Sequence, residues 1–236
     1  MLASDYARLS VNRILAALPD IELRRVAWDG EVREMNKGDV TQHAGERIEL
    51  VVFPLGCLIS MRVELLDGTS IEAATIGREG FASLPVFFGA HTATLRGEVK
   101  LPGRALLVDC DQFRGHIEKN PELCSLLGRY AELLFVESAQ VNACSRAHSI
   151  QDRCVRWLLT AADQLGAETV PTTQAELAQS LGVRRASVTD ALNSLEQRGL
   201  ISIARGRLAI RDRRRLRAAA CECYDAIARQ FEQTSW

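Results

Sequence analysis

One amphipathic segment carries short polar and cationic side chains at its start. Residues 184–197 have four apolar positions at helical spacing: Val188, Ala191, Leu192 and Leu195. The other face carries our candidate site residues: Arg184, Arg185, Ser187, Thr189, Asp190 and Asn193. Guanidinium groups pair with guanine edges or phosphates, and short hydroxyl and amide groups hydrogen-bond at close range. A helix that presents such groups on its first turns is suited to entering the major groove of DNA.

The preceding segment predicts a second helix that would support the first. Thr172 or Thr173 can cap it, and Glu176 stands three residues after Thr173, as in a capping box. Its apolar face is made by three residues: Leu177, Ala178 and Leu181. Gly182 then ends the helix, because glycine adopts a positive φ at little cost. The two segments together predict a helix-turn-helix.

A β-hairpin is predicted directly after these helices. Residues 200–203 and 208–210 are apolar enough to form strands, and residues 204–207 between them predict a turn. Arg205 and Arg207 would lie at the tip of this wing, where they can reach phosphates. The whole stretch is typical of a winged helix-turn-helix.

Residues 172–210 resemble the DNA-binding domain of the CRP/FNR superfamily of bacterial transcription regulators. The segment before them resembles the rest of that architecture, and AAACECY at 218–224 is similar to the segment after the wing in many such regulators. The resemblance implies a sequence-specific, homodimeric regulator that binds double-stranded DNA. It also implies contact with RNA polymerase, and an effector domain whose ligand the sequence does not reveal.

The resemblance assigns roles to the candidate residues. Arg185 occupies the place of an arginine that reads guanine, and Arg184 could form a similar pair at about 1–3 kcal/mol of discrimination. Ala186 stands where many members have a glutamate, and Asp190 where the cyclic-AMP branch has a second arginine. The operator is therefore expected to differ from the familiar one. The other polar positions are assigned to phosphate, thymine-methyl, adenine or backbone contacts: Ser187, Thr189 and Asn193.

The segment from residue 32 to residue 110 has the pattern of short antiparallel strands. Five strands are predicted, at residues 49–53, 57–65, 70–75, 92–101 and 104–109. Asp67-Gly68 is a strong hairpin signal between two of them, and helices at residues 8–26 are expected to pack on the sheets. The predicted fold class is α+β: an N-terminal antiparallel, jelly-roll-like β-roll, a long dimerisation helix, and a C-terminal winged helix-turn-helix.

The nucleotide-binding members of the family hold the ligand with a glutamate and an arginine that this chain lacks. The corresponding stretch, residues 80–94, has small residues near Ala82 and Ser83 and no arginine just before Thr92. A buried anion without a cationic partner costs several kcal/mol. We therefore expect that cyclic AMP does not bind in the usual way. The apolar run 84–88 is interpreted as core or domain contact.

A long helix is predicted at residues 121–147. Its apolar stripe is wide: Leu123, Leu126, Leu127, Tyr130, Leu133, Leu134, Val136 and Val141. One side can pack on the β-roll and the rest against a twin helix, and burial within one subunit is the alternative. Three domains are predicted, at 1–120, 121–147 and 148–236, with a hinge near residues 146–149. One last helix is expected beyond Asp212.

Charge and cysteine usage set further bounds. Residues 171–236 hold 11 arginines, no lysine and 7 acidic residues, which gives +4; the total of −1 leaves −5 for residues 1–170. Positive charge is thus concentrated where DNA would lie. The seven scattered cysteines are interpreted as reduced, mostly buried thiols.

No metal or cofactor is predicted from these residues. Cys221 and Cys223 would point about 200° apart on a helix, and the four histidines show no metal spacing. The first cysteine is Cys57, so the sequence does not predict the N-terminal iron–sulfur site of one family branch. A haem-ligating histidine, as in another branch, remains an alternative.

Other classes of protein fit less well. No run of 18 apolar residues and no signal-peptide core is present, so we expect a cytoplasmic protein without a membrane span. No Ser/His/Asp order, phosphate loop or metal spacing predicts an enzyme. The competing interpretation is a ligand- or partner-binding signalling module whose winged domain contacts protein.

Overall fold

The computed structural model describes residues 8–68, 70–234 and 236 of the chain. The chain divides into two compact units, Met1–Glu132 with Ser235–Trp236, and Leu133–Thr234. The division falls inside the long helix α5, Pro121–Ala147.

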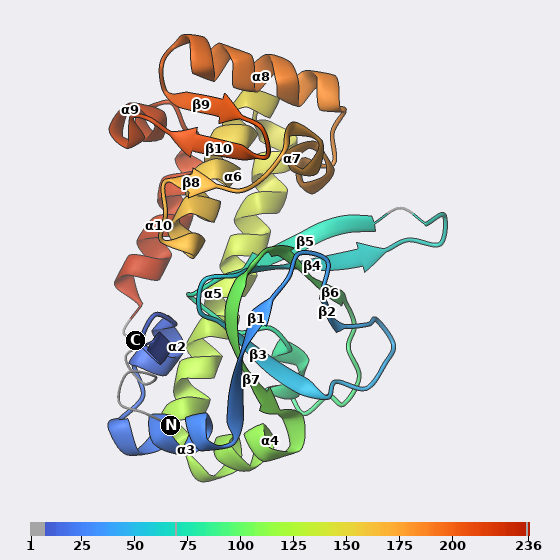
Figure 1. Cartoon of the computed structure of the whole chain (residues 1–236), viewed down its shortest axis with the longest axis vertical. Coiled ribbons are helices and arrows are strands. Elements are labelled where there is room, and N and C mark those ends of the chain that lie inside the picture. The colour runs from blue at the N-terminus through green and yellow to red at the C-terminus, as the bar shows by residue number, and fades with distance from the viewer. Residues whose placement is uncertain (1–7, 69, 235) are drawn as a thin grey trace. The chain divides into compact units, whose positions relative to one another are not determined.

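The first unit is built on two antiparallel sheets (Figure 1). The three-stranded sheet has the order β1-β7-β3, from Gly30–Met35, Gly103–Asp109 and Leu50–Pro54. The four-stranded sheet has the order β2-β6-β4-β5, from Val40–Gln42, Arg96–Leu101, Leu58–Glu64 and Ser70–Ile76. The predicted strands are confirmed, except that β6 starts later than expected: Thr92 forms only an isolated bridge with Arg47. The sequence pattern did not predict β1 and β2 as separate strands.

Aromatic side chains fill the core of this unit. Phe53 stacks on Phe81 at 5.6 Å between ring centroids, and both pack on Phe113. Tyr130 of α5 lies 5.5 Å from Phe81, so the first part of α5 belongs to this core. The apolar spacing of α5 thus places Leu123, Leu126, Leu127 and Tyr130 on the β-roll side.

Short helices pack on the sheets, as the sequence predicted for residues 8–26. They are α2 (Arg13–Ala16), α3 (Asp20–Trp28), the 3-10 turn η1 (Leu84–Val86) and α4 (Cys110–Lys119). Asn12 caps α2, and its buried amide donates to the carbonyls of Pro54 and Gly80 at 3.1 and 2.7 Å. This polar side chain helps to hold the N-terminal segment against the rest of the unit, together with the buried Ile14 and Leu15.

The second unit contains the end of α5 and the winged helix-turn-helix. Its helices are α6 (Ile150–Leu165), α7 (Gln174–Leu181), α8 (Arg185–Gln197), α9 (Arg213–Ala218) and α10 (Glu222–Gln233). Its sheet has the order β8-β10-β9, from Thr169–Val170, Arg207–Ile210 and Ile201–Ala204. The sequence predicted a two-stranded wing. The third strand joins because Leu208 pairs with Val170.

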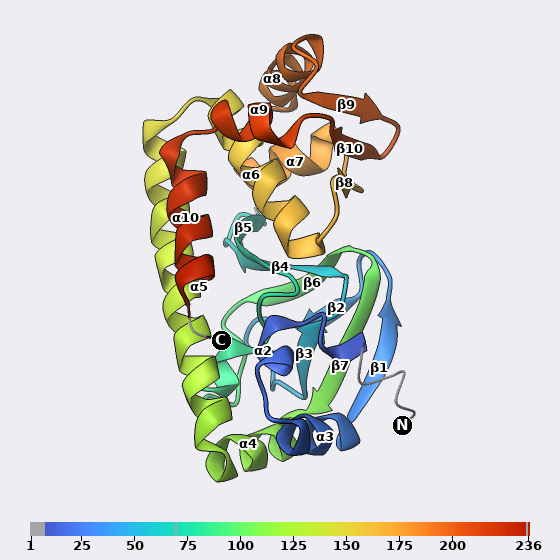
Figure 2. The same cartoon turned by 90° about the vertical axis from the view of Figure 1, so that its left-hand side faces the viewer.

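The single last helix expected after Asp212 is wrong, because the chain breaks between α9 and α10. Arg213 hydrogen-bonds to Asp163 on α6, and it also donates to the Tyr224 hydroxyl at 3.1 Å. In one continuous helix Arg213 and Tyr224 would be separated by about 16 Å along the helix axis. The hydrogen bond therefore requires a turn, and α10 lies beside the C-terminal part of α5 (Figures 1 and 2).

Within the part of the chain that the structure describes, no helix is both long enough and apolar enough to span a membrane.

Candidate nucleic-acid interface

The first helix of the pair, α7, begins and ends as its sequence predicts. Thr173 is the N-cap: its hydroxyl accepts from the Glu176 amide at 3.2 Å, and the Glu176 carboxylate accepts from the Thr173 amide at 3.0 Å. Gly182 ends the helix at φ +63°, a conformation that costs other residues energy. Arg153 of α6 donates to the Leu181 carbonyl, which holds the corner between α7 and α8.

The second helix, α8, separates an apolar underside from a polar outer face. Its buried residues are the four predicted ones: Val188, Ala191, Leu192 and Leu195. The candidate residues Arg184, Arg185, Asp190 and Asn193 are exposed, and Ser187 and Thr189 are half-buried. Arg184 is the N-cap and Arg185 opens the first turn. The charged start of α8 therefore faces solvent on a firmly packed helix.

Thr189 is engaged inside the protein. Its hydroxyl lies 2.8 Å from Gln174 Oε1 on α7 and 3.1 Å from the Arg185 carbonyl. A hydroxyl has one proton to donate, and both of these partners are acceptors. Thr189 thus links α7 to α8 and offers an external ligand its methyl group and oxygen lone pairs. The sequence did not mark Gln174, because no local pattern connects it with Thr189.

The wing carries its arginines at a tight turn. Ala204 pairs with Arg207, which leaves Arg205 and Gly206 as the turn, with Gly206 at φ +74°. Glu196 of α8 accepts a hydrogen bond from the Ile203 amide at 2.6 Å. This bond ties the edge strand β9 to α8. Arg205 and Arg207 are exposed, and with Arg184 and Arg185 they make up what we call the arginine surface.

A groove of about 560 Å³ lies between α7, α8 and the wing. Its walls include the first turn of α7, at Thr173 and Gln174, together with Arg185 and Arg205. The N-terminal end of a helix carries partial positive charge, and guanidinium groups bind phosphate oxygens. The groove is therefore suited to an anionic group such as a backbone phosphate.

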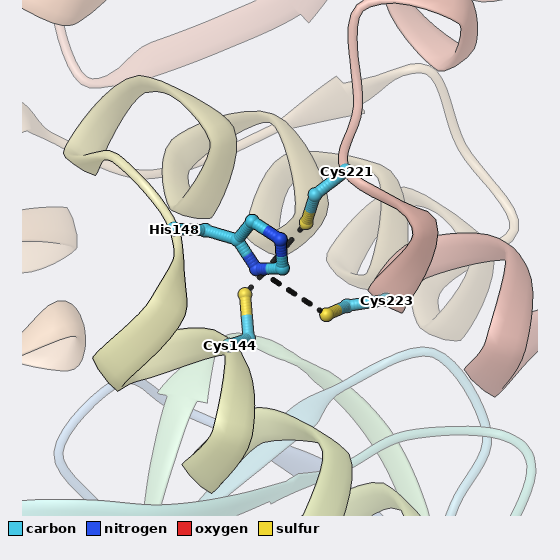
Figure 3. A group of neighbouring side chains, drawn as sticks. All are labelled: Cys144, His148, Cys221 and Cys223. Atoms are coloured by element: carbon cyan, nitrogen blue, oxygen red, sulfur yellow. Dashed lines mark hydrogen bonds between the residues drawn. The ribbon is translucent and has the colours of Figure 1, made fainter.

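A second group of side chains, which could bind a metal ion, was missed by the sequence analysis. Cys144, His148, Cys221 and Cys223 converge, with their ligand atoms all within 4.8 Å of one another (Figure 3). We call them the Cys3His cluster. They come from the end of α5, the turn into α6, and the start of α10.

The sequence argument against this convergence is wrong on two counts. Cys221 is the N-cap of α10 with extended backbone, φ −70° and ψ 162°, so the helical separation from Cys223 does not apply. His148 is four residues after Cys144, and its amide still donates to the Cys144 carbonyl at 3.1 Å, so both side chains lie on one helical face. That i, i+4 pair was the signal available in the sequence.

The thiols of the chain are free cysteines. Cys124 is exposed and Cys221 half-buried, and the other five are buried, so the expectation of mostly buried thiols holds. Burial raises the pKa of the Cys221 thiol to about 12 and also raises the pKa of Cys144. The positive charge of the nearby Arg156 guanidinium opposes the rise in the pKa of Cys144.

In the first unit, the stretch that corresponds to the family's nucleotide site is tied into the protein. Phe81 and Ala82 are buried, and Ser83, at φ +79°, donates to the Leu50 carbonyl at 2.9 Å and lies 3.1 Å from Gln42 Oε1. Glu79, upstream, is 6% exposed, and its carboxylate accepts from the Gly77 amide at 2.8 Å. These polar groups stabilise the loop itself.

The architecture combines a β-roll, a long helix and a winged helix-turn-helix. Residues 152–219 match the family model described as the Crp-like helix-turn-helix domain. The predicted CRP/FNR-like fold is confirmed, and several of the proteins that share it are described as transcriptional or global regulators rather than as enzymes.

Three solved structures illustrate the shared fold. FixK2 from Bradyrhizobium japonicum is 15% identical with a TM-score of 0.69, and the match covers 81% of this chain and 98% of that one. The c-di-GMP-responsive global regulator CLP from Xanthomonas campestris is 13% identical with a TM-score of 0.66, covering 82% and 100%. A CRP-family transcriptional regulator from Thermus thermophilus is 17% identical with a TM-score of 0.65, covering 80% and 96%. No curated protein sequence matches the chain.

Proposed function

We propose that the chain is a sequence-specific DNA-binding transcription regulator that acts as a homodimer, with α8 in the major groove. One observation carries the proposal: four arginines from the start of α8 and from the wing are exposed on a framework fixed by Glu196 and the α8 underside. Phosphate contacts supply affinity and groove contacts supply specificity. The arginine surface contains groups suited to both.

Each candidate residue has a role in this proposal. Arg184 and Arg185 read guanine edges from the first turn of α8, and Asn193 contacts adenine or backbone further along. Ser187 and the methyl group of Thr189 contact phosphate or thymine. Arg205 and Arg207 bind phosphates from the wing. Asp190 shapes the choice of base, because its carboxylate accepts hydrogen bonds where the cyclic-AMP branch has a donor.

The proposed dimer uses the uncovered side of α5. Phe135 is 75% exposed, and Ala139 and Ala143 come after it at intervals of four residues, so an apolar strip runs along the helix. Half-buried Leu134 and Val141 flank this strip. A twin helix would cover it, and a two-fold molecule would match two half-sites about one helical turn apart.

The remaining assignments rest on the same architecture. Residues 1–120 form the effector domain, residues 121–147 the dimerisation helix, and residues 148–236 the DNA-binding domain. The protein acts in the cytoplasm and contacts RNA polymerase. Its effector is unidentified, and it is not cyclic AMP in the usual mode, because the stretch from Gly80 to Thr94 holds no arginine to neutralise the cyclic phosphate.

The test is selection of bound fragments from random and genomic duplex DNA, with and without cell extract. We expect a two-fold symmetric site, binding that weakens steeply with salt because counterions are released, and a dimer in sedimentation. A monomer that ignores duplex DNA in dilute buffer would contradict the proposal. Such a result would instead favour a signalling module whose winged domain contacts protein.

A further inference from the structure

Four potential metal ligands converge within the second unit. In the sequence they lie before and after the residues of the arginine surface. The Sγ atoms of Cys144 and Cys221 lie 3.7 Å apart, and Cys223 Sγ lies 3.5 Å from His148 Nδ1. We propose that the Cys3His cluster is a site for one zinc ion, which joins the α5–α6 connection to the start of α10.

Two of the six separations between the ligand atoms fit a single tetrahedral ion, and all six are within 4.8 Å. With Zn–S near 2.3 Å and Zn–N near 2.0–2.1 Å, tetrahedral geometry separates two sulfurs by about 3.8 Å and a sulfur from a nitrogen by about 3.6 Å. The two observed separations, 3.7 and 3.5 Å, agree with these values. Three thiolates and one imidazole form an established ligand set for zinc in closed sites.

Neighbouring side chains supply the supporting hydrogen bonds that metal ligands usually have. His148 Nε2 lies 3.3 Å from the Glu222 carboxylate, which leaves Nδ1 facing Cys223 as the nitrogen for the ion. This is the carboxylate–histidine arrangement that orients a ligating imidazole. Gln140 Nε2 donates to Cys223 Sγ at 3.1 Å.

A buried cation balances the charge of the site. Three thiolates and one Zn²⁺ carry one net negative charge, which is costly to bury without compensation. Arg156 on α6 is 4% exposed, and its guanidinium lies close enough to the Cys144 thiol to interact with it electrostatically. The guanidinium therefore offsets the residual charge and connects α6 to the site.

Other uses of these four residues fit the geometry less well. In a [4Fe–4S] cluster each ligand binds a different iron, and in a [2Fe–2S] cluster the ligands divide between two irons, so the four ligand atoms spread farther apart than the 4.8 Å within which all of them lie here. A disulfide between Cys144 and Cys221 would use neither His148 nor Cys223. A catalytic zinc keeps a position open for water, whereas here the protein supplies four ligands. The geometry thus favours a closed, fold-stabilising site.

The site has a consequence for the winged domain. His148 lies between α5 and α6, directly before the Ser149 cap of α6, and Cys221 lies between α9 and α10. A bound ion would hold both connections at once, because it replaces weak thiol contacts with four metal–ligand bonds. Metal occupancy would therefore fix α10 against the end of α5.

The experiment uses the full-length reduced protein, purified from zinc-supplemented cells. We expect elemental mass spectrometry to find about one zinc per chain in the wild-type protein. Cys221→Ser and Cys144→Ser should each hold less than about a tenth of that amount. Cys154→Ala is the control, because Cys154 is buried like Cys144, lies on α6 and is not part of the cluster. It should keep its zinc.

A second measurement does not depend on the ligand variants folding. Chelator-treated wild-type protein is titrated with Co²⁺. A tetrahedral Co²⁺ site with thiolate ligands gives ligand-field bands in the visible range and charge-transfer bands in the near ultraviolet. Added Zn²⁺ should abolish both sets of bands. Gln140→Ala and Glu222→Gln leave all four ligands in place and should weaken Zn²⁺ binding by about 10- to 100-fold. Equal affinity in both variants and wild type would contradict the assigned supporting roles.

Three results would overturn the proposal. The first is a wild-type protein that stays metal-free and gives no tetrahedral Co²⁺ spectrum. The second is a resting Cys144–Cys221 disulfide, found by mass spectrometry without reductant. The third is iron with the broad visible absorbance of an iron–sulfur cluster. None of these readouts requires DNA, so the zinc site and the proposed regulator function fail or stand separately.

Discussion

The arginine surface and the Cys3His cluster lie in the same unit, yet their residues are brought together differently. The arginines come from one continuous stretch, residues 184–207, and each is exposed on its own. The cluster joins Cys144 to Cys221 and His148 to Cys223 across 77 and 75 positions of the chain. All of its residues lie outside the segment that matches the family model, residues 152–219, with two before it and two after it.

This difference predicts two kinds of response to mutation. Exposed side chains that contact different groups of a DNA duplex act nearly independently, so single losses on the arginine surface should be moderate and largely additive. Ligands that share one ion act together, so the loss of any one should remove most of the effect. Four measurements test this difference. The first concerns the buried side of α8, which supports the arginine surface.

The largest effect is expected from Leu192→Ala on the underside of α8. Leu192 is fully buried, and the cavity left behind should lower the free energy of unfolding by about 2–5 kcal/mol. Urea denaturation followed by circular dichroism measures the change. Asn193→Ala is the control, because Asn193 is exposed on the same helix and should change stability by less than about 0.5 kcal/mol. Similar losses in both variants would show that α8 is not packed as described.

The second effect concerns stabilisation by zinc. At free Zn²⁺ about 100-fold above its dissociation constant, the wild-type protein should gain about 2.7 kcal/mol in the free energy of unfolding. Cys221→Ser should gain almost nothing, and Cys154→Ala should gain as much as wild type. Denaturation with and without Zn²⁺ checks this. If Cys221→Ser kept half of the gain, the cluster would not act as a unit.

The third effect is a loss of specificity at the start of α8. Arg185→Ala should weaken binding to the selected DNA site by about 1–3 kcal/mol and change binding to random DNA little, because a base contact is lost. Fluorescence anisotropy on both duplexes measures the difference. Arg198→Ala, an exposed arginine at the other end of α8, should leave the ratio unchanged. Equal weakening on both duplexes would refute the base-reading role of Arg185.

The smallest effect is expected from the wing. Arg207→Ala should weaken binding to all sequences alike and lower the slope of log affinity against log salt by about 1, since one phosphate contact is removed. Arg229→Ala, on α10, should not change the slope. A loss confined to the selected site would instead make Arg207 a base contact.

Most of the winged domain was predictable from local sequence. The capping box of Thr173 and Glu176, the positive φ at Gly182, and the apolar spacing of α8 depend on neighbours within a few residues. The same holds for the strands β3, β4, β5 and β7, which alternate or run apolar between turn signals. Local energetics and the tertiary fold agree at these places, so the pattern was sufficient.

Tertiary structure alone decided the remainder. The break before Cys221 results from the contacts of Arg213 with Asp163 and Tyr224, and the engagement of Thr189 results from Gln174 on another helix. Periodicity favoured one helix after Asp212, and that helix would have turned Cys221 away from Cys223. The amino-acid sequence determined which segments form helices and strands, because those preferences act over a few residues. The meeting of the cysteines and the histidine of the Cys3His cluster required the folded unit, because only packing brings distant backbone turns to one point.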